Sequence, residues 1–264
     1  MKKQEFEGKI ALVTGASRGL GQHLAMRLAD EGCDLIICDL NLEQLEVTKE
    51  QVQQKTASRV IALKVDVTSE NDVKRMVETT VAELSTIDLL VCNAALSFSG
   101  SIHDISLENW RRIVDVNLFG YFLCVREVSR VMIQNNSGAI VQINSRTGKR
   151  GTAKNSAYAA SKGGGIVLTQ SLSAELAEYN IRVNAVCPGS LFESPLWQEV
   201  LFKDYSQRYG LTPDEIKKKY LEVVPLNRGC EYEDVANLVV FLLSDKADYI
   251  TGQAMNVTGG EVVW

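Results

Sequence analysis

The stretch from Ser145 to Lys162 has the residue types and the spacing of an acid–base centre. It reads SRTGKRGTAKNSAYAASK, with Tyr158 and Lys162 four positions apart and Ser145 thirteen residues before the tyrosine. If the chain is helical from about residue 156, Tyr158 and Lys162 are neighbours on one face. An ammonium favours the charged form of a nearby phenol, which would make Tyr158 a general acid/base without a histidine. The alternative is an exposed helix pair with no chemical role, because this spacing often arises by chance.

A glycine-rich loop near the N-terminus indicates a nucleotide site. Thr14 and Gly15 end an apolar run at 9–14, and Gly19 and Gly21 follow at the spacing GxxxGxG before an amphipathic segment. Between a strand and a helix, such glycines allow a tight turn and let a pyrophosphate approach the helix N-terminus closely. A glycine-rich turn that binds no ligand is the other interpretation.

Two charged residues bear on the choice of nicotinamide cofactor. Asp39 ends the second apolar run, eighteen residues after Gly21. A carboxylate there accepts hydrogen bonds from the adenosine ribose hydroxyls and repels a 2′-phosphate, so it favours NAD over NADP. Arg18 is the opposing observation, because a guanidinium near that spot can hold a 2′-phosphate. The alternatives are a solvated strand-end charge for Asp39 and a surface cation for Arg18.

Polar residues also follow the third and fourth apolar runs. Asp66 and Val67 end the third run, and Asn93 and Ala94 end the fourth. Ligands bind at the carboxyl ends of strands in open α/β sheets, where Asp66 can accept a hydrogen bond from an adenine amino group. Asn93 is equally a candidate cap or turn residue. Asn117 lies in an otherwise apolar helical segment, so it is either structural or holds a water in a proton path.

The elements that would position these residues alternate regularly along the chain. Nearly all-apolar runs are separated by helical stretches, which is the pattern of a parallel sheet covered on both faces. No linker or composition break divides the sequence, so we predict one doubly wound α/β domain over 1–264, with 190–228 as a lid-like insertion. The expected strands are 9–14, 34–39, 59–66, 87–95, 138–145, 181–189 and 254–260. The expected helices are 20–31, 42–55, a segment after the N-cap Ser69 with Asp72 as its loose capping-box partner, 106–134, a segment from about 156, and 233–244.

Composition and charge exclude several classes of protein. The 264 residues are 45% hydrophobic and 23% charged, which is ordinary for a globular protein. The net charge of −5 implies no attraction to nucleic acid or to an anionic membrane. The sequence contains no run of about 18 apolar residues that could span a bilayer, and its first residues contain no signal-peptide core.

The cysteines and histidines indicate neither a metal site nor disulfides. Most of the six cysteines lie in apolar runs, as buried free thiols do, and there are only two histidines. No ligand set at zinc spacing can be assembled from them, so no metal is expected. A reducing cytoplasm is the simplest interpretation of the cysteines.

Taken together, these motifs resemble the short-chain dehydrogenase/reductase family over essentially the whole chain. The resemblance rests on TGxxxGxG, Asp66-Val67, NAA at 93–95, Asn117, Ser145, YxxxK at 158–162, Pro188-Gly189 and the closing TGQAMNVTGG. It implies a Rossmann-type fold, a nicotinamide cofactor and usually a homotetramer.

The resemblance also implies roles for individual residues. Tyr158 would be the acid/base, and Lys162 would lower its pKa and bind the nicotinamide ribose. Ser145 would orient the substrate oxygen, and Asn117 would hold a water of the proton relay. The cofactor-binding residues that it implies are Gly15, Ser17, Arg18, Gly19, Leu20, Gly21, Asp39, Asp66, Val67, Asn93, Ala94, Tyr158, Lys162, Pro188 and Gly189.

A cluster of cations in the loop before Tyr158 bears on the substrate. Arg146, Lys149, Arg150 and Lys154 lie beside the expected substrate mouth and would suit a phosphate dianion. A solvated basic loop, or a surface between subunits, explains the same cluster. From about residue 116 to the C-terminus the sequence also resembles family members that act on polyol phosphates with NAD. The substrate-binding residues expected on this basis are Ser145, Lys149, Lys154 and Tyr158.

The segment after Gly189 departs from the family's common PGxxxT pattern. It reads SLFESPLW, so Glu193 or Ser194 stands where a threonine usually meets the nicotinamide carboxamide. A glutamate beside a sugar phosphate is unfavourable, so Glu193 is expected to point away.

Other functions and one structural question stay open on the sequence. The enzyme could act on an unphosphorylated polyol, a sugar or an oxoacyl substrate. The chain could also be a non-catalytic nucleotide-binding regulator, against which the intact Ser145, Tyr158 and Lys162 count. Apolar side chains on helices 106–134 and 156–178 could pack against a partner subunit or against the chain's own sheet.

Overall fold

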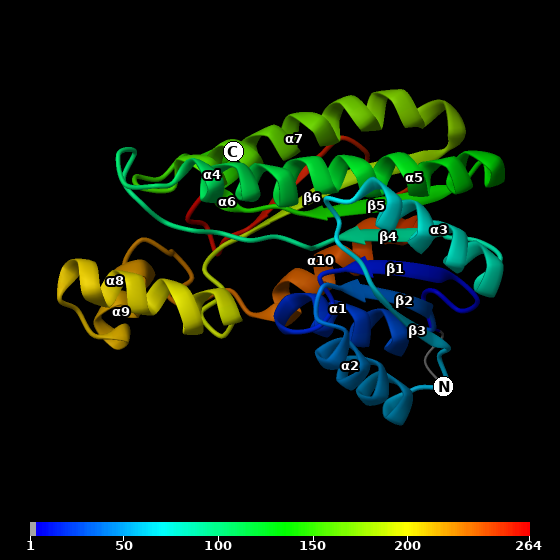
Figure 1. Ribbon diagram of the computed structural model, residues 1–264, viewed down its shortest axis with the longest axis horizontal. Helices are drawn as coiled ribbons and strands as arrows, with labels where there is room; N and C mark the ends of the chain where they lie inside the picture. Colours follow the sequence, from blue (N-terminus) through cyan, green and yellow to red (C-terminus); the bar gives the residue numbers. More distant parts are fainter. Residues whose placement is uncertain (1–3) are drawn as a thin grey trace.

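The apolar runs of the sequence form one parallel sheet in the computed structural model, which describes residues 4–264 (Figure 1). The spatial order of the strands is β3-β2-β1-β4-β5-β6-β7, and neighbouring strands are parallel throughout. The order reverses between β1 and β4, the kind of switch point at which open α/β sheets bind ligands. Each strand lies within the run predicted for it: β1 (Ile10–Thr14), β2 (Asp34–Asp39), β3 (Val60–Lys64), β4 (Leu89–Cys92), β5 (Gly138–Ile143), β6 (Ile181–Pro188) and β7 (Ala254–Val257).

Helices cover both faces of this sheet, and each face has its own apolar core (Figure 1). On one face pack α1 (Gly19–Asp30), α2 (Leu42–Lys55) and α10 (Tyr232–Leu243). On the other pack α3 (Glu70–Leu84), α5 (Gly120–Asn135) and α7 (Ser156–Leu176). These two helical layers confirm the predicted doubly wound α/β fold. Strands that are buried on both faces need a layer of helices on each side.

The start of α3 confirms the predicted cap and corrects its partner. The Ser69 hydroxyl accepts a hydrogen bond from the Asp72 backbone N–H at 3.3 Å, so Ser69 is the N-cap. The Asp72 carboxylate accepts from the backbone N–H of Asp66 at 3.1 Å instead of from Ser69. This contact ties the end of β3 to the helix that follows it.

The predicted helical zone 106–134 is interrupted by one wider turn. It consists of α4 (Leu107–Val114), the π-helical turn η1 (Asp115–Phe119) and α5. The turn contains Asn117, whose side chain is hydrogen-bonded to a loop outside the helix. Inserted π-turns of this kind are frequent at functional sites.

Residues 190–228, called the lid segment below, form a helical projection beside the sheet (Figure 1). It contains the π-helical turn η3 (Leu196–Leu201), α8 (Phe202–Tyr209) and α9 (Pro213–Leu221). The Thr212 capping box and Pro213 at the first turn start α9. The segment has an apolar cluster of its own, made by Phe192, Trp197, Phe202 and Ile216. The lid is therefore held together separately from the two cores of the sheet.

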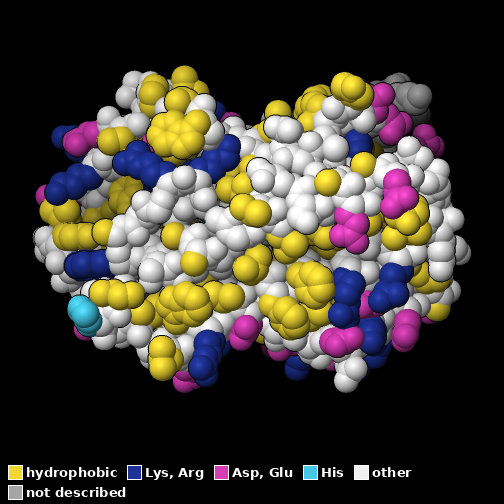
Figure 2. All heavy atoms as spheres, turned by 90° about the horizontal axis from the view of Figure 1, so that it is seen from above, with side chains coloured by type: hydrophobic (Ala, Val, Ile, Leu, Met, Phe, Trp, Pro, Cys, Tyr) yellow, Lys and Arg dark blue, Asp and Glu magenta, His cyan; other side chains and the backbone are white. Residues whose placement is uncertain are grey.

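One outer face of the molecule carries exposed apolar side chains. Figure 2 looks onto α4, α5 and α7 and shows such side chains spread along this face. The exposed large apolar side chains of these elements include Leu107 on α4, Phe119 on η1 and Val167 on α7. Other apolar side chains of α5 and α7, such as Val128 and Leu176, pack inward on the chain's own sheet, which is one of the two alternatives raised by the sequence. Among the helices of residues 4–264, none has the length and apolarity needed to cross a bilayer.

Candidate active site

A cleft of about 620 Å³ lies at the carboxyl ends of the central strands and beneath the lid segment. Its walls come from the loops after β1, β4, β5 and β6, from α7 and from α8. This is the place that the switch point predicts for a ligand. The predicted residues that line it are Gly15, Ser17, Arg18, Gly19, Leu20, Gly21, Asp39, Asn93, Ala94, Ser145, Tyr158, Lys162, Pro188 and Gly189.

Ser145, Tyr158 and Lys162 meet in this cleft because two helices begin beside the end of β5. The Ser145 hydroxyl accepts from the backbone N–H of Thr147 at 3.1 Å and caps the short helix α6 (Arg146–Lys149). Helix α7 then places Tyr158 and Lys162 one turn apart, with the lysine Nζ 5.6 Å from the centre of the tyrosine ring. Lys162 is only 2% exposed, and its Nζ donates to the Ile143 carbonyl at 2.8 Å. That bond fixes the ammonium at the end of β5.

Burial acts on the pKa values of both Tyr158 and Lys162. Burial raises the pKa of Tyr158, while the hydrogen bond with Ser145 and the charge of Arg146 act in the lowering direction. The Lys162 Nζ is directed to the Ile143 carbonyl. Burial also lowers the pKa of Lys162 to about 8. Tyr158 is therefore a neutral phenol at neutral pH.

The glycine loop has the shape that a dinucleotide needs. Gly15 and Gly19 have φ values of +66° and +60°, which favour glycine. A Cβ added at Gly21 would lie 2.0 Å from the Gly15 carbonyl oxygen, so no larger residue fits there. Helix α1 begins at Gly19. The side chain of its N-cap residue, Arg18, forms no capping hydrogen bond with the first turn of the helix. The first amides of α1 thus remain available to a pyrophosphate.

Asn93 braces this loop instead of capping a helix. Its Nδ2 donates to the carbonyl oxygens of Thr14 and Gly15 at 3.1 and 2.9 Å. The Thr14 hydroxyl in turn accepts from the backbone N–H groups of Asn93 and Ala94, both at 3.0 Å. Thr14, for which the sequence pattern predicts no separate role, joins the ends of β1 and β4.

The two residues that bear on the cofactor are both engaged. An Asp39 carboxylate oxygen accepts from the Ser17 backbone N–H at 3.2 Å, which places the carboxylate against the glycine loop. Arg18 Nη1 donates to both carboxylate oxygens of Glu199 in the lid segment, at 2.7 and 2.8 Å. Both side chains of the pair are more than half exposed. The carboxylate thus lies at the position expected for a ribose contact, and the guanidinium is directed to the lid.

The Asn117 side chain is already satisfied by protein groups. Its Oδ1 accepts from the Leu96 N–H at 2.9 Å, and its Nδ2 donates to the Leu96 carbonyl at 2.9 Å and the Ser161 hydroxyl at 3.1 Å. The amide therefore ties the loop after β4 to α7. Asn117 and Lys162 also line a cavity of about 10 Å³, roughly the volume that one water needs.

Several predicted residues lie outside the cleft. Asp66 accepts from the Thr68 backbone and hydroxyl at 2.9 and 2.7 Å, and Val67 packs against α5, where a Cβ on Gly120 would lie 2.8 Å from its side chain. Neither lines the cleft, and Lys149 and the exposed Lys154 do not line it either. The structure does not bring these two lysines into the cleft: Lys149 ends α6, and Lys154 lies in the turn before α7.

Residues of the lid segment form the part of the cleft wall for which the sequence predicted no definite residue. Glu193 points away, as expected: its side chain is 79% exposed and lies 3.8 Å from Lys217, whereas Ser194 lines the cleft. Sequence reasoning missed the lid residues Trp197, Tyr205 and Arg208, which also line it. The sequence shows that aromatic and basic residues occur within 190–228. It does not show which face of the lid helices meets the cleft.

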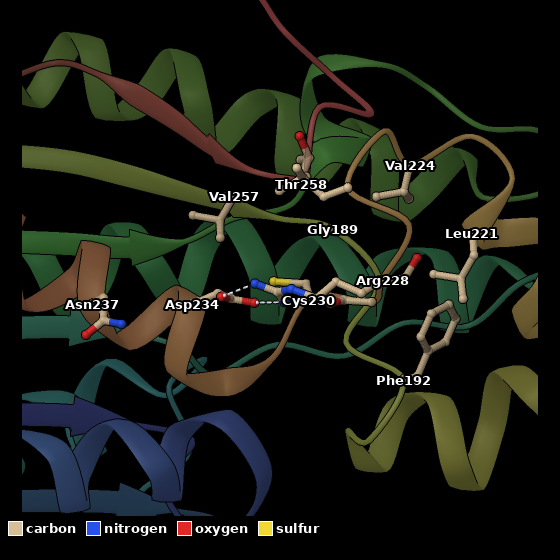
Figure 3. A pocket seen from close by; sticks show the side chains of 14 residues that line it. Gly189, Phe192, Leu221, Val224, Arg228, Cys230, Asp234, Asn237, Val257 and Thr258 are labelled. Atoms are coloured by element: carbon tan, nitrogen blue, oxygen red, sulfur yellow. Dashed lines mark hydrogen bonds and ion pairs between the residues drawn. The ribbon is translucent and has the colours of Figure 1, made fainter.

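A smaller pocket of about 250 Å³ lies on the other side of Gly189, between the lid and α10 (Figure 3). Arg228 points along it and forms two hydrogen bonds with Asp234, at 2.6 and 2.7 Å. The remaining wall is largely apolar, with Phe192, Val224 and Val257. The charge of Arg228 is already neutralised by Asp234, so this pocket is a weaker binding site for an anion than the main cleft is. Among residues 4–264 no group of histidine, cysteine and acidic side chains is arranged to hold a metal ion.

The parallel sheet has a glycine loop at its switch point, and a Ser–Tyr–Lys cluster lies in the same cleft. This combination defines a dehydrogenase or reductase that binds a nicotinamide nucleotide. The sequence model of the family described as short chain dehydrogenase matches residues 9–202. The chain belongs to the short-chain dehydrogenase/reductase family, which confirms the resemblance found in the sequence.

Similar curated proteins include enzymes with different substrates. Sorbitol-6-phosphate 2-dehydrogenase of Escherichia coli (strain K12) is 40% identical over 258 residues, which are 97% of this chain and 99% of that one. The 3-oxoacyl-[acyl-carrier-protein] reductase FabG of Staphylococcus epidermidis is 36% identical over 96% of this chain and 98% of its own. The chain is thus similar over its full length both to a polyol-phosphate dehydrogenase and to an oxoacyl reductase.

Solved structures show the same spread. Sorbitol-6-phosphate 2-dehydrogenase SrlD from Erwinia amylovora superposes with a TM-score of 0.92 at 40% identity, covering 96% of this chain and 100% of that one. NAD⁺-bound xylitol dehydrogenase has a TM-score of 0.92 at 33% identity, with 97% and 100% covered. Actinorhodin polyketide ketoreductase with NADPH gives 0.92 at 33%, with 100% of both chains covered. The protein is therefore an oxidoreductase that acts on CH–OH groups with a nicotinamide cofactor, and relatives with either nucleotide share its fold.

Proposed function

We propose that the protein is an NAD-dependent dehydrogenase of a sugar or polyol phosphate that interconverts sorbitol 6-phosphate and fructose 6-phosphate. The observation that carries the proposal is one cleft in which Ser145, Tyr158 and Lys162 lie against a dinucleotide loop. The 40% identity to sorbitol-6-phosphate 2-dehydrogenases over nearly the whole chain supports this substrate.

The residues of the cleft suit alcohol oxidation. When bound, the oxidised nicotinamide supplies the acceptor for a hydride from the carbinol carbon. Tyr158 takes the proton of the hydroxyl group as the carbonyl forms, and Ser145 donates to or accepts from the same oxygen to orient it. Lys162 holds a positive charge beside the tyrosine ring and is anchored for this by the Ile143 carbonyl. The water-sized cavity between Asn117 and Lys162 supports a role for both in proton transfer to the outside.

The preference for NAD rests on Asp39. Its carboxylate lies beside Ser17 at the end of β2, where it can bind a ribose diol and would meet a 2′-phosphate as a like charge. Arg18, the cation that could offset that repulsion, is paired with Glu199. The adenosine side of the cleft therefore suits NAD better than NADP. Asp66 and Val67 remain candidates for the adenine contact.

Turnover measured in four combinations tests both parts of the proposal. The combinations pair NAD or NADP with sorbitol 6-phosphate or free sorbitol. We expect kcat/KM to be highest with NAD and sorbitol 6-phosphate. Free sorbitol should lower it at least about tenfold, because a charge-assisted contact is lost. NADP should lower it by a similar order, about tenfold or more, because of the like charge at Asp39.

Each half of that experiment can fail separately. Equal rates with sorbitol and its 6-phosphate would remove the phosphate from the proposal and leave a polyol dehydrogenase. A clear preference for NADP would overturn the cofactor assignment alone. The second candidate, a reductase of an oxoacyl substrate, is favoured by the 36% identity to FabG. Faster NADPH-dependent reduction of an acetoacetyl thioester than of fructose 6-phosphate would establish that candidate instead.

We also propose that the chain assembles as a homotetramer in the cytoplasm. The exposed apolar side chains of α4, η1 and α7 support a contact with another copy, since these three elements pack against one another. All six cysteines are free, and five of them are buried, which supports a reducing compartment. Light scattering should give a particle of about four times the chain mass of 29.1 kDa. A particle with the mass of one chain would contradict the assembly.

A further inference from the structure

The cationic side chains that line the cleft differ in how far their charge is already offset. Within residues 4–264 the cations of this lining are Arg18, Arg146, Lys162 and Arg208. Arg18 is paired with Glu199, and Arg146 is paired with the nearly buried Glu261. Lys162 is buried and committed to the Ile143 carbonyl. Among the described residues, no carboxylate forms a direct ion pair with Arg208, so of the three arginines in this lining its charge is the least offset.

Arg208 is held in place by neutral contacts. It lies in the last turn of α8, with its guanidinium 5.8 Å from the ring centre of Tyr205 and 6.0 Å from that of Tyr209. Its Nη2 donates to the Ser99 hydroxyl at 3.2 Å. That hydroxyl donates to the Asp204 carboxylate at 2.7 Å, which directs the nearest acid of α8 to the serine and not to the arginine. A guanidinium has five N–H donors, so most of those on Arg208 stay available.

The position of Arg208 joins two walls of the cleft. Ser99 lies in the loop that follows β4, while Arg208 belongs to the lid segment. The same cleft contains Ser145 and Tyr158, so a substrate that reaches Tyr158 with its carbinol lies between these walls. The basic loop before Tyr158 offers no equivalent, because Lys149 and Lys154 do not line the cleft. Arg146 does line it, but its charge is offset by Glu261.

We propose that Arg208 binds the phosphate group of the substrate and thereby sets the preference for a phosphorylated polyol. The inference rests on the proposed function and adds the residue that recognises the anion. A guanidinium matches a phosphate with two parallel N–H donors, which gives orientation as well as attraction. Binding at Arg208 fixes the far end of a short chain and so presents one particular carbinol to Tyr158. The contact also ties the substrate to the lid segment through α8.

The test compares Arg208→Ala and Arg208→Lys with the wild type. The matched control is Lys203→Ala, which removes an exposed cation of the same helix that does not line the cleft. For Arg208→Ala we expect the KM for sorbitol 6-phosphate to rise by about 10- to 100-fold, because a charge-assisted contact of that strength is lost. The KM for NAD and the rate with free sorbitol should change by less than about threefold. Arg208→Lys should recover part of the loss, since lysine keeps the charge without the fork.

A binding measurement without turnover gives a second readout. Thermal melting of the NAD complex with added inorganic phosphate should show a rise in Tm for the wild type and for Lys203→Ala, and none for Arg208→Ala. The proposal is overturned if Arg208→Ala lowers turnover of sorbitol and its phosphate equally. It is also overturned if that variant raises the KM for NAD in place of the KM for substrate, or leaves every value unchanged. A wild type that does not distinguish sorbitol from its phosphate would instead remove the proposed phosphate substrate itself, and that result needs no variant.

Discussion

Replacing Tyr158 by phenylalanine should abolish turnover while leaving cofactor binding intact. The substitution removes only the phenol oxygen from a side chain that lies against Lys162 and Ser145. General acid–base catalysis contributes about 10²- to 10⁴-fold, so we expect kcat to fall by about 10³-fold or more. The affinity for NADH, measured by fluorescence titration, should change by less than about threefold, because the ring that packs in the cleft is retained.

The pH dependence should identify the same group. Burial raises the pKa of Tyr158, so its phenolate is scarce at neutral pH and becomes more populated as the pH rises. Oxidation of the alcohol, which needs the phenolate as a base, should therefore accelerate with rising pH. Reduction of the ketone, which needs the phenol as an acid, should show the opposite trend. Tyr158→Phe should remove both dependences together with the activity.

Tyr209→Phe is the matched control for this experiment. Tyr209 lines the same cleft from the lid segment and is largely exposed, but it has no contact with Ser145 or Lys162 within the described residues. This variant should keep at least about half of the wild-type kcat, because no reacting group is removed. If Tyr158→Phe kept more than a tenth of the wild-type kcat, Tyr158 would not be the acid/base.

Gly21→Ala should abolish cofactor binding, which is the second large effect. The added Cβ would lie 2.0 Å from the Gly15 carbonyl oxygen, 2.5 Å from Asn93 Nδ2 and 2.8 Å from the Gly15 carbonyl carbon. Two of these atoms belong to the backbone, so they cannot rotate away as a flexible side chain would. The glycine loop and its brace must shift together. We expect the Kd for NADH to rise by about 100-fold or more and Tm to fall by several degrees.

Gly151→Ala is the control for the effect of a methyl group on a glycine. Among the described residues nothing lies within 4 Å of a Cβ at Gly151, and its φ is not in the left-handed region. This variant should bind NADH as the wild type does and melt at a similar or slightly higher temperature. Wild-type affinity for NADH in Gly21→Ala would show that the loop does not hold the dinucleotide in the way the geometry indicates.

The sequence predicted best where one physical signal dominates. All strands were located because buried parallel strands read as short apolar runs, and β2 even ends at the predicted Asp39. The acid–base cluster was found because Tyr158 and Lys162 obey helical spacing. Their surroundings were not predictable in the same way. Burial, which raises the pKa of Tyr158, depends on tertiary packing around the side chain, and no local pattern encodes that.

Contacts between distant segments explain what the sequence did not predict. The π-turn at Asp115–Phe119 was expected to be ordinary helix, and it accompanies bonds from Asn117 to Leu96, 21 residues earlier. Similarly, Lys149 and Lys154 were chosen for the substrate by their nearness in sequence to Tyr158. Arg208, about 50 residues further along, lines the cleft in their place, because α8 of the lid segment forms one wall of it.

The separate apolar core of the lid segment has a consequence for how this enzyme can change. Phe192, Trp197, Phe202 and Ile216 stabilise the lid on their own, apart from the two cores that hold the sheet. Substitutions on the cleft face of α8 can therefore accumulate without disturbing the strands that position Ser145 and the glycine loop. In such a scaffold, evolution or protein design can change the substrate specificity while the catalytic residues and the hydride-transfer chemistry stay the same. This separation of substrate binding from catalysis predicts relatives that share the fold and differ in substrate. The xylitol dehydrogenase and the polyketide ketoreductase, both 33% identical, are of this kind.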